Sequence, residues 1–363
     1  MRQLTFSARG RLLWEQVPDA VLVQPGDALV APLVAARCDL DTVLLAGLAD
    51  KLRWGLRLGL IDSTVYQHFG ARPFAGPYPF GHECIARVEQ VGAAVANFVP
   101  GQLVVVPFQV SCGSCVQCAR GATGLCDAVP SIAAFGMGLG YGGVLSDRLR
   151  VPFADAMLVA VPDGVDPLSV VSAADNLSDA YGLVSRALAL RPGSDVLIVG
   201  GTGASVGLYS VGIALALGAS EVHYTDTDPG RLALAAQLGA TPAERTTPGL
   251  PNELYRHYTI VIDASASRGG LDFALRSTGR GGVLASAGIH FHNGTKLPLY
   301  QMYARGISLQ LSLPNVRSEL PKVLALVASG ELQPQLVTTR VARWDDAHEA
   351  FYEPGAKLVV SRL

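Results

Sequence analysis

A short apolar strand followed by a glycine-rich turn constrains the fold of this chain more than any other feature of its sequence. Residues 196–199 read Val-Leu-Ile-Val, a wholly apolar run of the kind that is buried in a parallel sheet. The turn Gly-Gly-Thr-Gly-Ala-Ser-Val-Gly follows at 200–207, and a helical pattern runs from Leu208 to Leu217. This order brings backbone N–H groups and the positive end of a helix against a pyrophosphate. It therefore predicts half of a dinucleotide-binding sheet.

An acidic residue lies about one βαβ step beyond this turn. The strand predicted over 221–225 leads directly into Asp226. A carboxylate at this position accepts hydrogen bonds from the adenosine ribose hydroxyls and repels a 2′-phosphate, which favours NAD over NADP. A second interpretation, in which Asp226 only caps a helix, stays open. The strands predicted over 259–263 and 282–285 continue the alternation of strand and helix.

The length and charge of the chain limit its class. With 363 residues it exceeds the size that one hydrophobic core usually supports, so two domains are expected. A net charge of -2 and the lack of a basic stripe argue against a nucleic-acid partner. Residues 1–10 lack the apolar run of a signal peptide, and no apolar run has the length of a membrane span. We therefore expect no membrane partner and a cytoplasmic location.

Four of the six cysteines are packed into fifteen residues. Such a cluster is a disulfide framework in many small secreted domains, but in a long chain without a signal peptide metal ligation is the better interpretation. The spacing C-x2-C-x2-C-x7-C brings four thiolates together from one short segment of the chain, which suits a closed, tetrahedral structural zinc. The predicted ligands are Cys112, Cys115, Cys118 and Cys126.

A second metal site is predicted around the triplet Gly81-His82-Glu83. Cys38 upstream offers a soft ligand and Asp175 downstream a hard one, so the three side chains could hold one catalytic zinc. Alone, a cysteine after an apolar run is usually a small buried hydrophobe, and a lone histidine is usually a satisfied core or surface residue. The case therefore depends on the cysteine cluster and the glycine turn that follow in the chain.

The remaining segments indicate where the two domains begin and end. Residues 1–35 have the texture of antiparallel strands and turns, whereas 51–60 fit a strand period and a helical face equally well. The aromatic residues between 66 and 80 either pack for their own sake or line a substrate cleft. A helix begins at Asp175, one runs from 320 to 330, and the last residues return to short strands around a helix. His290 and His292 follow a strand, and exposed loop histidines are favoured there over metal ligands.

Taken together, these residues resemble the zinc-containing medium-chain alcohol dehydrogenase family over nearly the whole chain. The resemblance depends on Cys38 with Asp41, on Gly81-His82-Glu83, on the four-cysteine lobe, on the glycine turn with Asp226, and on Lys357-Leu358-Val359-Val360. It implies an α/β protein with a Rossmann domain at 179–311, inserted into a GroES-like, mainly β catalytic domain at 1–178 and 312–363. The zinc lobe, about 112–126, belongs to the catalytic domain.

The resemblance also implies ligands and cofactors for specific positions. The catalytic zinc is expected on Cys38, His82 and Asp175, with Glu83 as a neighbour or exchangeable ligand, and the second zinc on the four-cysteine lobe. NAD is expected along the residues of the glycine turn, with its ribose on Asp226 and Arg231 near the adenosine. Those turn residues are Gly201, Gly203, Val206 and Gly207. Other members of the family form homodimers or homotetramers, so we expect a homo-oligomer.

This chain departs from the family pattern at four points. Leu40 takes the place of the hydroxyl residue that begins the proton relay, and a leucine cannot carry a proton. Asp179 replaces a threonine beside the nicotinamide, where it is either a substitute acid and base or a solvated helix residue. The glycine turn is one residue longer than in most zinc-containing members. Cys38 and His82 are 44 residues apart, about twice the usual separation, which predicts an insertion that reshapes the substrate cleft.

Three functions follow from these observations. The first is an NAD-dependent zinc oxidoreductase that acts on a bulky, fairly apolar alcohol or on the matching ketone or aldehyde. The second is an NAD(P)H-dependent reductase of a C=C or C=N bond, which Leu40 favours because such a reaction protonates no zinc-bound oxygen. The third is a binding or structural protein without catalysis. The complete ligand set argues against the third, because nothing but chemistry requires both Cys38 and His82.

Overall fold

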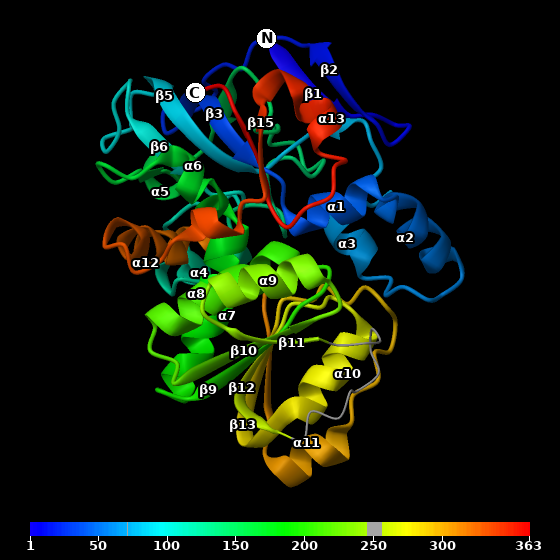
Figure 1. Cartoon of the computed structure of the whole chain (residues 1–363). Coiled ribbons are helices and arrows are strands. Elements are labelled where there is room, and N and C mark those ends of the chain that lie inside the picture. Colours follow the sequence, from blue (N-terminus) through cyan, green and yellow to red (C-terminus); the bar gives the residue numbers. More distant parts are fainter. Residues whose placement is uncertain (71, 245–255) are drawn as a thin grey trace. The chain divides into compact units, whose positions relative to one another are not determined.

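The computed structural model describes residues 1–70, 72–244 and 256–363, which form two compact units (Figure 1). The first unit contains Met1–Ser178, Leu313–Ala328 and Thr338–Leu363, and the second contains Asp179–Ser312 and Ser329–Val337. Ser312 and Ser329–Val337 thus lie with the second unit, whereas the predicted ranges placed them with the catalytic domain. Among the described residues, no helix combines the length and apolarity needed to cross a bilayer.

The first unit is built mainly from antiparallel strands. Its sheets have the orders β2-β1-β4 and β15-β16-β3-β5-β6-β8, with β7 pairing to β3. These strands are β1 (Arg2–Phe6), β2 (Leu12–Gln16), β3 (Ala28–Ala36), β4 (Tyr78–Pro79), β5 (Glu83–Val91), β6 (Leu103–Val106), β7 (Leu149–Val151), β8 (Val159–Ala160), β15 (Arg340–Arg343) and β16 (Leu358–Ser361). The predicted antiparallel texture of the N-terminal residues is confirmed by β1, β2 and β3. Their inward side chains join one apolar core that reaches from Leu4 to Val360.

Short helices connect and cover these strands. They are α1 (Asp39–Leu45), α2 (Leu48–Arg57), α3 (Val65–Phe69), α4 (Val116–Ala119), α5 (Ala154–Met157), α6 (Pro167–Val170), α12 (Val316–Ala328) and α13 (Ala347–Ala350), with 3-10 turns η1 (Thr123–Leu125), η2 (Val171–Ala174) and η4 (Trp344–Asp346). Figure 1 shows α1, α2 and α3 in blue, beside one another. All three lie in the segment that separates Cys38 from His82 in the sequence.

The segment with two possible periods is a helix. In α2, Leu48 and Leu52 are buried, while Arg53 and Trp54 face outward. A strand would place Leu52 and Trp54 on the same face, but Leu52 is buried and Trp54 is exposed, so the burial follows the helical period rather than the strand period. Of the aromatic residues that follow, Phe74, Tyr78 and Phe80 are buried, and Tyr78 and Phe80 pack against Phe6 in the core. Packing therefore accounts for these three.

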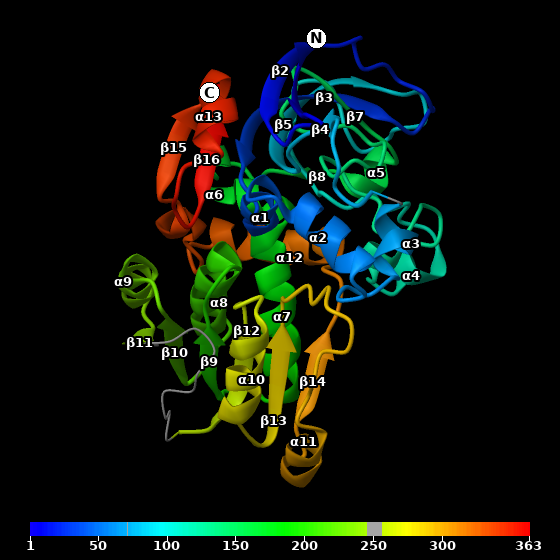
Figure 2. The same cartoon turned by 90° about the vertical axis from the view of Figure 1, so that its right-hand side faces the viewer.

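The second unit is a parallel sheet of six strands in the order β11-β10-β9-β12-β13-β14. Figure 2 shows the strands labelled in this order from left to right. They are β9 (Asp195–Val199), β10 (Glu221–Asp226), β11 (Thr241–Glu244), β12 (Tyr258–Asp263), β13 (Thr278–Ser286) and β14 (Ser308–Leu311). Counted from the first strand of the unit, the order is 3-2-1-4-5-6, which is the order of a Rossmann sheet. The predicted fold class is thus confirmed.

Helices pack on this sheet and place the glycine turn. They are α7 (Asn176–Leu190), α8 (Ala204–Ala216), α9 (Pro229–Gln237), α10 (Arg268–Ser277) and α11 (Leu299–Arg305), with η3 (Pro334–Val337) beside α8. The chain passes from the first unit to the second within the first turn of α7. Helix α8 begins at Ala204, four residues earlier than predicted, so the glycine turn shortens to residues 200–203. In such sheets, ligands bind at the carboxyl ends of the strands where the strand order reverses, here between β9 and β12.

Candidate metal centres and dinucleotide site

The three predicted ligands of the catalytic zinc lie together in the first unit. One ligand atom from each of Cys38, His82 and Asp175 lies within 4.8 Å of the other two, and all three residues are buried. Nε2 of His82 is 3.3 Å from Oδ2 of Asp175. Ligands held about 2.0–2.1 Å from a tetrahedral zinc are about 3.3 Å apart, so this spacing fits such an ion. Residues 137 positions apart in the sequence thus form one donor set of sulfur, nitrogen and oxygen.

Strand register explains why Cys38 and His82 meet. In the antiparallel pair β3 and β5, Ala36 lies opposite Glu83. Cys38 follows Ala36 by two residues and His82 precedes Glu83 by one, so both leave the same end of the strand pair. Gly81, just before His82, has φ +85°, a backbone conformation that a residue with a side chain rarely adopts. The glycine of the Gly-His-Glu triplet therefore serves the turn that aims the histidine.

The third ligand comes from the turn between η2 and α7. Asp175 has φ -155° and ψ -92°, which ends η2 immediately before α7 begins. The carbonyl oxygen of Ala174 accepts a hydrogen bond from the N–H of Phe108 (3.0 Å), and the Asp175 N–H donates to the carbonyl of Ser172 (3.1 Å). This turn is therefore tied to the sheet, and the Asp175 carboxylate is held inside the unit.

Carboxylates surround the donor set. Oδ1 of Asp41 lies 3.7 Å from Nδ1 of His82, on the ring edge opposite the one that faces Asp175. At this distance the two groups attract each other electrostatically without a hydrogen bond, and a carboxylate on this side of a metal-binding imidazole favours a proton on Nδ1. Oε1 of Glu83 accepts a hydrogen bond from Nζ of Lys357 at 2.7 Å, and both side chains are fully buried.

The buried charges favour a divalent cation. Burial raises the pKa of Cys38 well above its usual value, and Asp175, Asp41 and Glu83 raise it further. Burial likewise raises the pKa of Glu83 to about 7, although Lys357 opposes this shift. Buried Oε2 of Glu83, Oδ1 of Asp41 and Nδ1 of His82 have no hydrogen-bond partner among the described residues. Burial penalises the ionised form of these groups, and a bound cation would compensate that cost, so the residues present fit a zinc ion.

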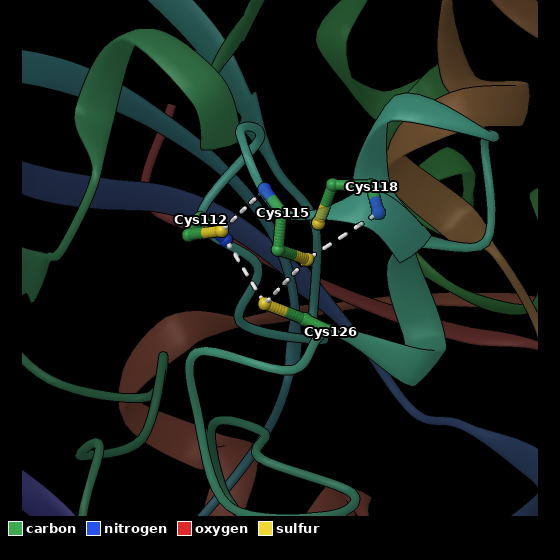
Figure 3. A group of neighbouring side chains, drawn as sticks. All are labelled: Cys112, Cys115, Cys118 and Cys126. Atoms are coloured by element: carbon green, nitrogen blue, oxygen red, sulfur yellow. Dashed lines mark hydrogen bonds between the residues drawn. The ribbon is translucent and has the colours of Figure 1, made fainter.

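The four cysteines of the lobe also lie together. Figure 3 shows their sulfur atoms directed toward one another, and all four sulfur atoms lie within 4.8 Å of each other. Sγ of Cys115 is 3.9 Å from Sγ of Cys126, close to the edge of about 3.8 Å expected between thiolates on a tetrahedral zinc. No cysteine of the described residues is in a disulfide. The disulfide alternative is therefore wrong for this cluster.

Backbone N–H groups in the lobe prepare two of the sulfur atoms for a metal. Sγ of Cys112 accepts hydrogen bonds from the N–H groups of Ser114 and Cys115, both at 3.4 Å. Burial alone would raise the pKa of Cys112, but these donors lower it to about 6. Hydrogen bonds from Cys118 and Asp127 lower the pKa of Cys115 in the same way. The thiolate form that binds metal is thus favoured at both positions.

In the second unit, the glycine turn packs closely on its surroundings. The N–H of Gly203 donates to the carbonyl of Ala264 (2.9 Å), which connects the turn after β9 to the loop after β12. A Cβ atom on Gly200 would lie 2.3 Å from Oδ2 of Asp226 and 2.3 Å from the hydroxyl of Tyr224. Only glycine leaves room for these two side chains beneath the turn. Val206 and Gly207 are buried in α8, and Gly201 and Gly203 are half-buried in the turn.

Asp226 lies at the end of β10 with its carboxylate fully buried. Arg231 donates two hydrogen bonds to it, from Nε to Oδ2 and from Nη2 to Oδ1, both at 2.7 Å. The Tyr224 hydroxyl donates to Oδ2 at 2.9 Å, and the N–H groups of Thr227 and Asp228 donate to Oδ1. Burial raises the pKa of Asp226, but Arg231 and Tyr224 outweigh burial and lower it. The cap of α9 is Asp228, so the cap interpretation of Asp226 is wrong.

Two domain families match the sequence. The alcohol dehydrogenase GroES-like domain matches residues 24–163, and the zinc-binding dehydrogenase domain matches 205–329. A medium chain reductase/dehydrogenase of an Acremonium species is 31% identical over 57% of this chain and 68% of its own length. The chain belongs to the zinc-containing medium-chain dehydrogenase/reductase family. As a member of this family, the protein is a zinc-dependent oxidoreductase.

Two further relatives match almost the whole chain. A probable zinc-binding alcohol dehydrogenase of Mycobacterium tuberculosis is 28% identical over 97% of this chain and 84% of its own length. The structure of an alcohol dehydrogenase from a Thermus species has a TM-score of 0.83 and 29% identity, with 99% of each chain covered. The similarity therefore extends over both units of the medium-chain dehydrogenase.

Other predicted residues lie outside the donor sets. Asp179 is half-buried in the first turn of α7 and belongs to neither metal group. Leu40 is half-buried in α1, and its N–H donates to Sγ of Cys38 at 3.4 Å. His292 is exposed, as expected, but Nε2 of His290 is buried without a hydrogen-bond partner among the described residues. Neither histidine joins a metal group.

Sequence reasoning missed one residue of the candidate metal site and left another without a role. Asn176 gave no signal beyond following Asp175 in the chain, yet its carboxamide contacts two of the predicted ligands. Lys357 was part of the C-terminal family motif, but nothing in the sequence connected it to Glu83. Both contacts depend on pairings between distant segments, which no local pattern reports.

Zinc content separates the two metal sites. We expect two zinc ions per chain in the wild type and one in both Cys38→Ala and Cys115→Ser, because each variant removes a ligand from a different donor set. Elemental analysis of freshly purified protein measures this, and thermal unfolding serves as the folding control. Two zinc ions retained in Cys38→Ala would contradict the assignment of the catalytic site. One zinc in both the wild type and Cys38→Ala would leave only the lobe metallated.

Proposed function

We propose that the protein is an NAD-dependent zinc dehydrogenase. It transfers a hydride from an alcohol to NAD, or in the reverse direction from NADH to the matching ketone or aldehyde. The observation that carries this proposal is the buried convergence of Cys38, His82 and Asp175, because a site with three protein ligands leaves the fourth position of a tetrahedral zinc open. A purely structural zinc has four protein ligands, as the cysteine lobe does.

The surrounding residues have distinct tasks in this proposal. Cys38, His82 and Asp175 would hold the zinc, which polarises a carbonyl or lowers the pKa of an alcohol when it is bound. Asp41 would hold the proton on Nδ1 of His82, so that Nε2 is the nitrogen that binds the metal. Glu83 would lie beside the three ligands and could replace one of them on the zinc, and Lys357 would balance its charge.

The side chains near the donor set favour an apolar substrate. The centroid of the Phe108 ring lies 5.5 Å from that of the His82 ring, and the backbone N–H of Leu40 donates to Sγ of Cys38 at 3.4 Å. Neither residue offers a hydrogen bond from its side chain, so a substrate that contacts them gains most from apolar surface. We therefore propose secondary or aromatic alcohols rather than sugars as the substrate class.

Leu40 also supports the second candidate, a reductase of a C=C or C=N bond. A leucine two residues after Cys38 provides no hydroxyl through which an alcohol proton could leave, whereas reduction of a C=C or C=N bond adds its proton at carbon or nitrogen and so does not require a relay to a zinc-bound oxygen. Asp179 is a candidate acid and base in either reaction. The two candidates differ in whether a hydroxyl at position 40 increases the rate.

NAD is the proposed cofactor because of the charge around Asp226. Its carboxylate is buried and ionised, and the guanidinium of Arg231 is held on it by two hydrogen bonds. The cation is therefore neutralised where the adenosine ribose would lie, and a 2′-phosphate would find little net positive charge. The Asp226 carboxylate already accepts hydrogen bonds from two backbone N–H groups, from Tyr224 and from Arg231. Ribose hydroxyls would bind by replacing some of these donors.

Substitution of Asp226 tests the cofactor preference. In Asp226→Ser, we expect the KM for NAD to rise and the ratio of kcat/KM for NADP to that for NAD to increase about tenfold or more. The reason is that the freed Arg231 can pair with a phosphate, and a charge-assisted hydrogen bond contributes about 1.5–3 kcal/mol. The double variant Asp226→Ser/Arg231→Ala should lose most of this gain. Equal effects on both cofactors would show that Asp226 does not read the ribose.

An activity screen tests the zinc chemistry directly. We expect the zinc-loaded protein to form NADH from secondary or aromatic alcohols, and Cys38→Ala to lose about a thousandfold in kcat/KM, because several kcal/mol of charge stabilisation would be lost with the metal. The formation of NADH is followed by its absorbance. If Cys38→Ala retains full activity, particularly toward an activated C=C bond, the reaction does not use this zinc.

The residue at position 40 distinguishes the two candidates. If a missing hydroxyl limits alcohol oxidation, Leu40→Thr should raise kcat for the alcohol about tenfold or more, since positioned proton transfer typically contributes at least a hundredfold. Leu40→Val is the matched control, because valine has nearly the shape of threonine without the hydroxyl. Equal rates in the two variants would mean that another route already moves the proton.

A further inference from the structure

The Asn176 side chain is buried at the start of α7, where it contacts four groups. Its Nδ2 donates hydrogen bonds to Sγ of Cys38 at 3.2 Å and to Oδ2 of Asp175 at 3.1 Å. Its Oδ1 accepts from Nζ of Lys357 at 3.0 Å and from the N–H of Asp39 at 3.2 Å. A carboxamide has two N–H donors and two acceptor lone pairs, so all of its hydrogen-bonding capacity is matched here.

The orientation of this carboxamide is dictated by its neighbours. An ammonium group and a backbone N–H are both donors, so the amide oxygen must face Lys357 and Asp39. A flipped amide would place its NH2 group against two donors and its oxygen against a sulfur and a carboxylate. The NH2 group is therefore directed at the zinc ligands.

Two of the three predicted ligand atoms are contacted by this one NH2 group. Oδ2 of Asp175, which receives one of its N–H bonds, is also the oxygen that lies 3.3 Å from Nε2 of His82. The same group fixes the direction of the Cys38 sulfur. Outer groups that hydrogen-bond to metal ligands orient them and tune their donor strength.

The charge of Lys357 polarises the Asn176 carboxamide. Its ammonium is fully buried between Oε1 of Glu83 and Oδ1 of Asn176. A cation at the carbonyl end of an amide polarises the group, so the N–H groups at the other end become stronger donors. The charge of Lys357 thus acts on the Cys38 sulfur through the amide.

On the basis of the proposed catalytic zinc, we propose that Asn176 is a positioning residue of that site. It holds Cys38 and Asp175 in the geometry that binds the metal, and it transmits the positive charge of Lys357 to the thiolate. The N–H···S bond withdraws electron density from the sulfur, which leaves the metal a stronger acceptor of electrons from a fourth ligand. Asn176 directly follows Asp175 and is the first residue of α7, so the start of this helix places both side chains at the site.

Cobalt spectroscopy tests this role without any turnover. Asn176→Asp keeps the shape and an oxygen for Lys357 and Asp39, but it replaces the NH2 donor by an acceptor. Asn176→Ser serves as the second variant, because its small side chain reaches neither ligand. In Co²⁺-loaded protein, we expect the sulfur-to-cobalt charge-transfer band of the catalytic site to shift to lower energy in both variants. Competition with a chromophoric chelator should show Co²⁺ bound about 10- to 100-fold more weakly.

The Cys38→Ala protein provides the reference. Its cobalt spectrum contains only the four-cysteine lobe, so subtracting it from the other spectra isolates the catalytic site, and the lobe bands report that each variant is folded. An unchanged charge-transfer band and unchanged affinity in Asn176→Asp and Asn176→Ser would overturn the proposal. A wild-type spectrum identical to that of Cys38→Ala would instead overturn the proposed catalytic site itself. The two failures are therefore distinguishable.

Discussion

The pairing of β3 with β5 on one side and β16 on the other is the constraint on which the candidate metal site depends. Register in these pairs places Ala36 opposite both Glu83 and Val359. Cys38, His82 and Lys357 lie one or two residues beyond these positions and so meet at one end of the sheet. A slip of one residue in either pair would turn the side chains to the other face and separate them. Seven of the nine residues of β3 are buried, so such a slip would also disrupt the packing of the core.

The same pairing explains how the protein can bury so many ionisable groups. Asp41, Glu83 and Asp175 are buried around Cys38 and His82, and Lys357 is the buried cation that pairs with Glu83. Burial penalises isolated charges, and the cost is removed only when hydrogen bonds and opposite charges are provided together. The strands deliver one cation, α1 delivers Asp41, and α7 delivers Asn176. The ligand groups that remain without a cationic partner would favour a bound cation at the candidate site.

Local sequence patterns predicted the elements that lie within one short segment of the chain. The cysteine spacing, the apolar strand before the glycine turn, and the strand that ends in Asp226 each lie within a short segment, and the structure has these elements where the sequence predicts them. The segment 51–60 could not be assigned because its leucines fit two periods, and only the burial of Leu52 beside an exposed Trp54 decided between them. Asp226 and Asp228 are two residues apart, and their different roles follow from backbone geometry rather than residue type. The contact of Lys357 with Glu83 spans 274 residues, so no local signal could reveal it.

The low pKa of Cys112 has a consequence for the redox behaviour of the protein. Cys112 is only partly buried, and the N–H donors that lower its pKa would favour its thiolate in a lobe without zinc. Thiolates, rather than thiols, react with peroxides to form sulfenic acids, which condense with a neighbouring thiol. Cys126, whose sulfur accepts a hydrogen bond from the Cys112 N–H, is such a neighbour. Oxidation would then block the return of the metal until a reductant restored the thiols, so the lobe would remain intact under oxidising conditions only while it retained its zinc.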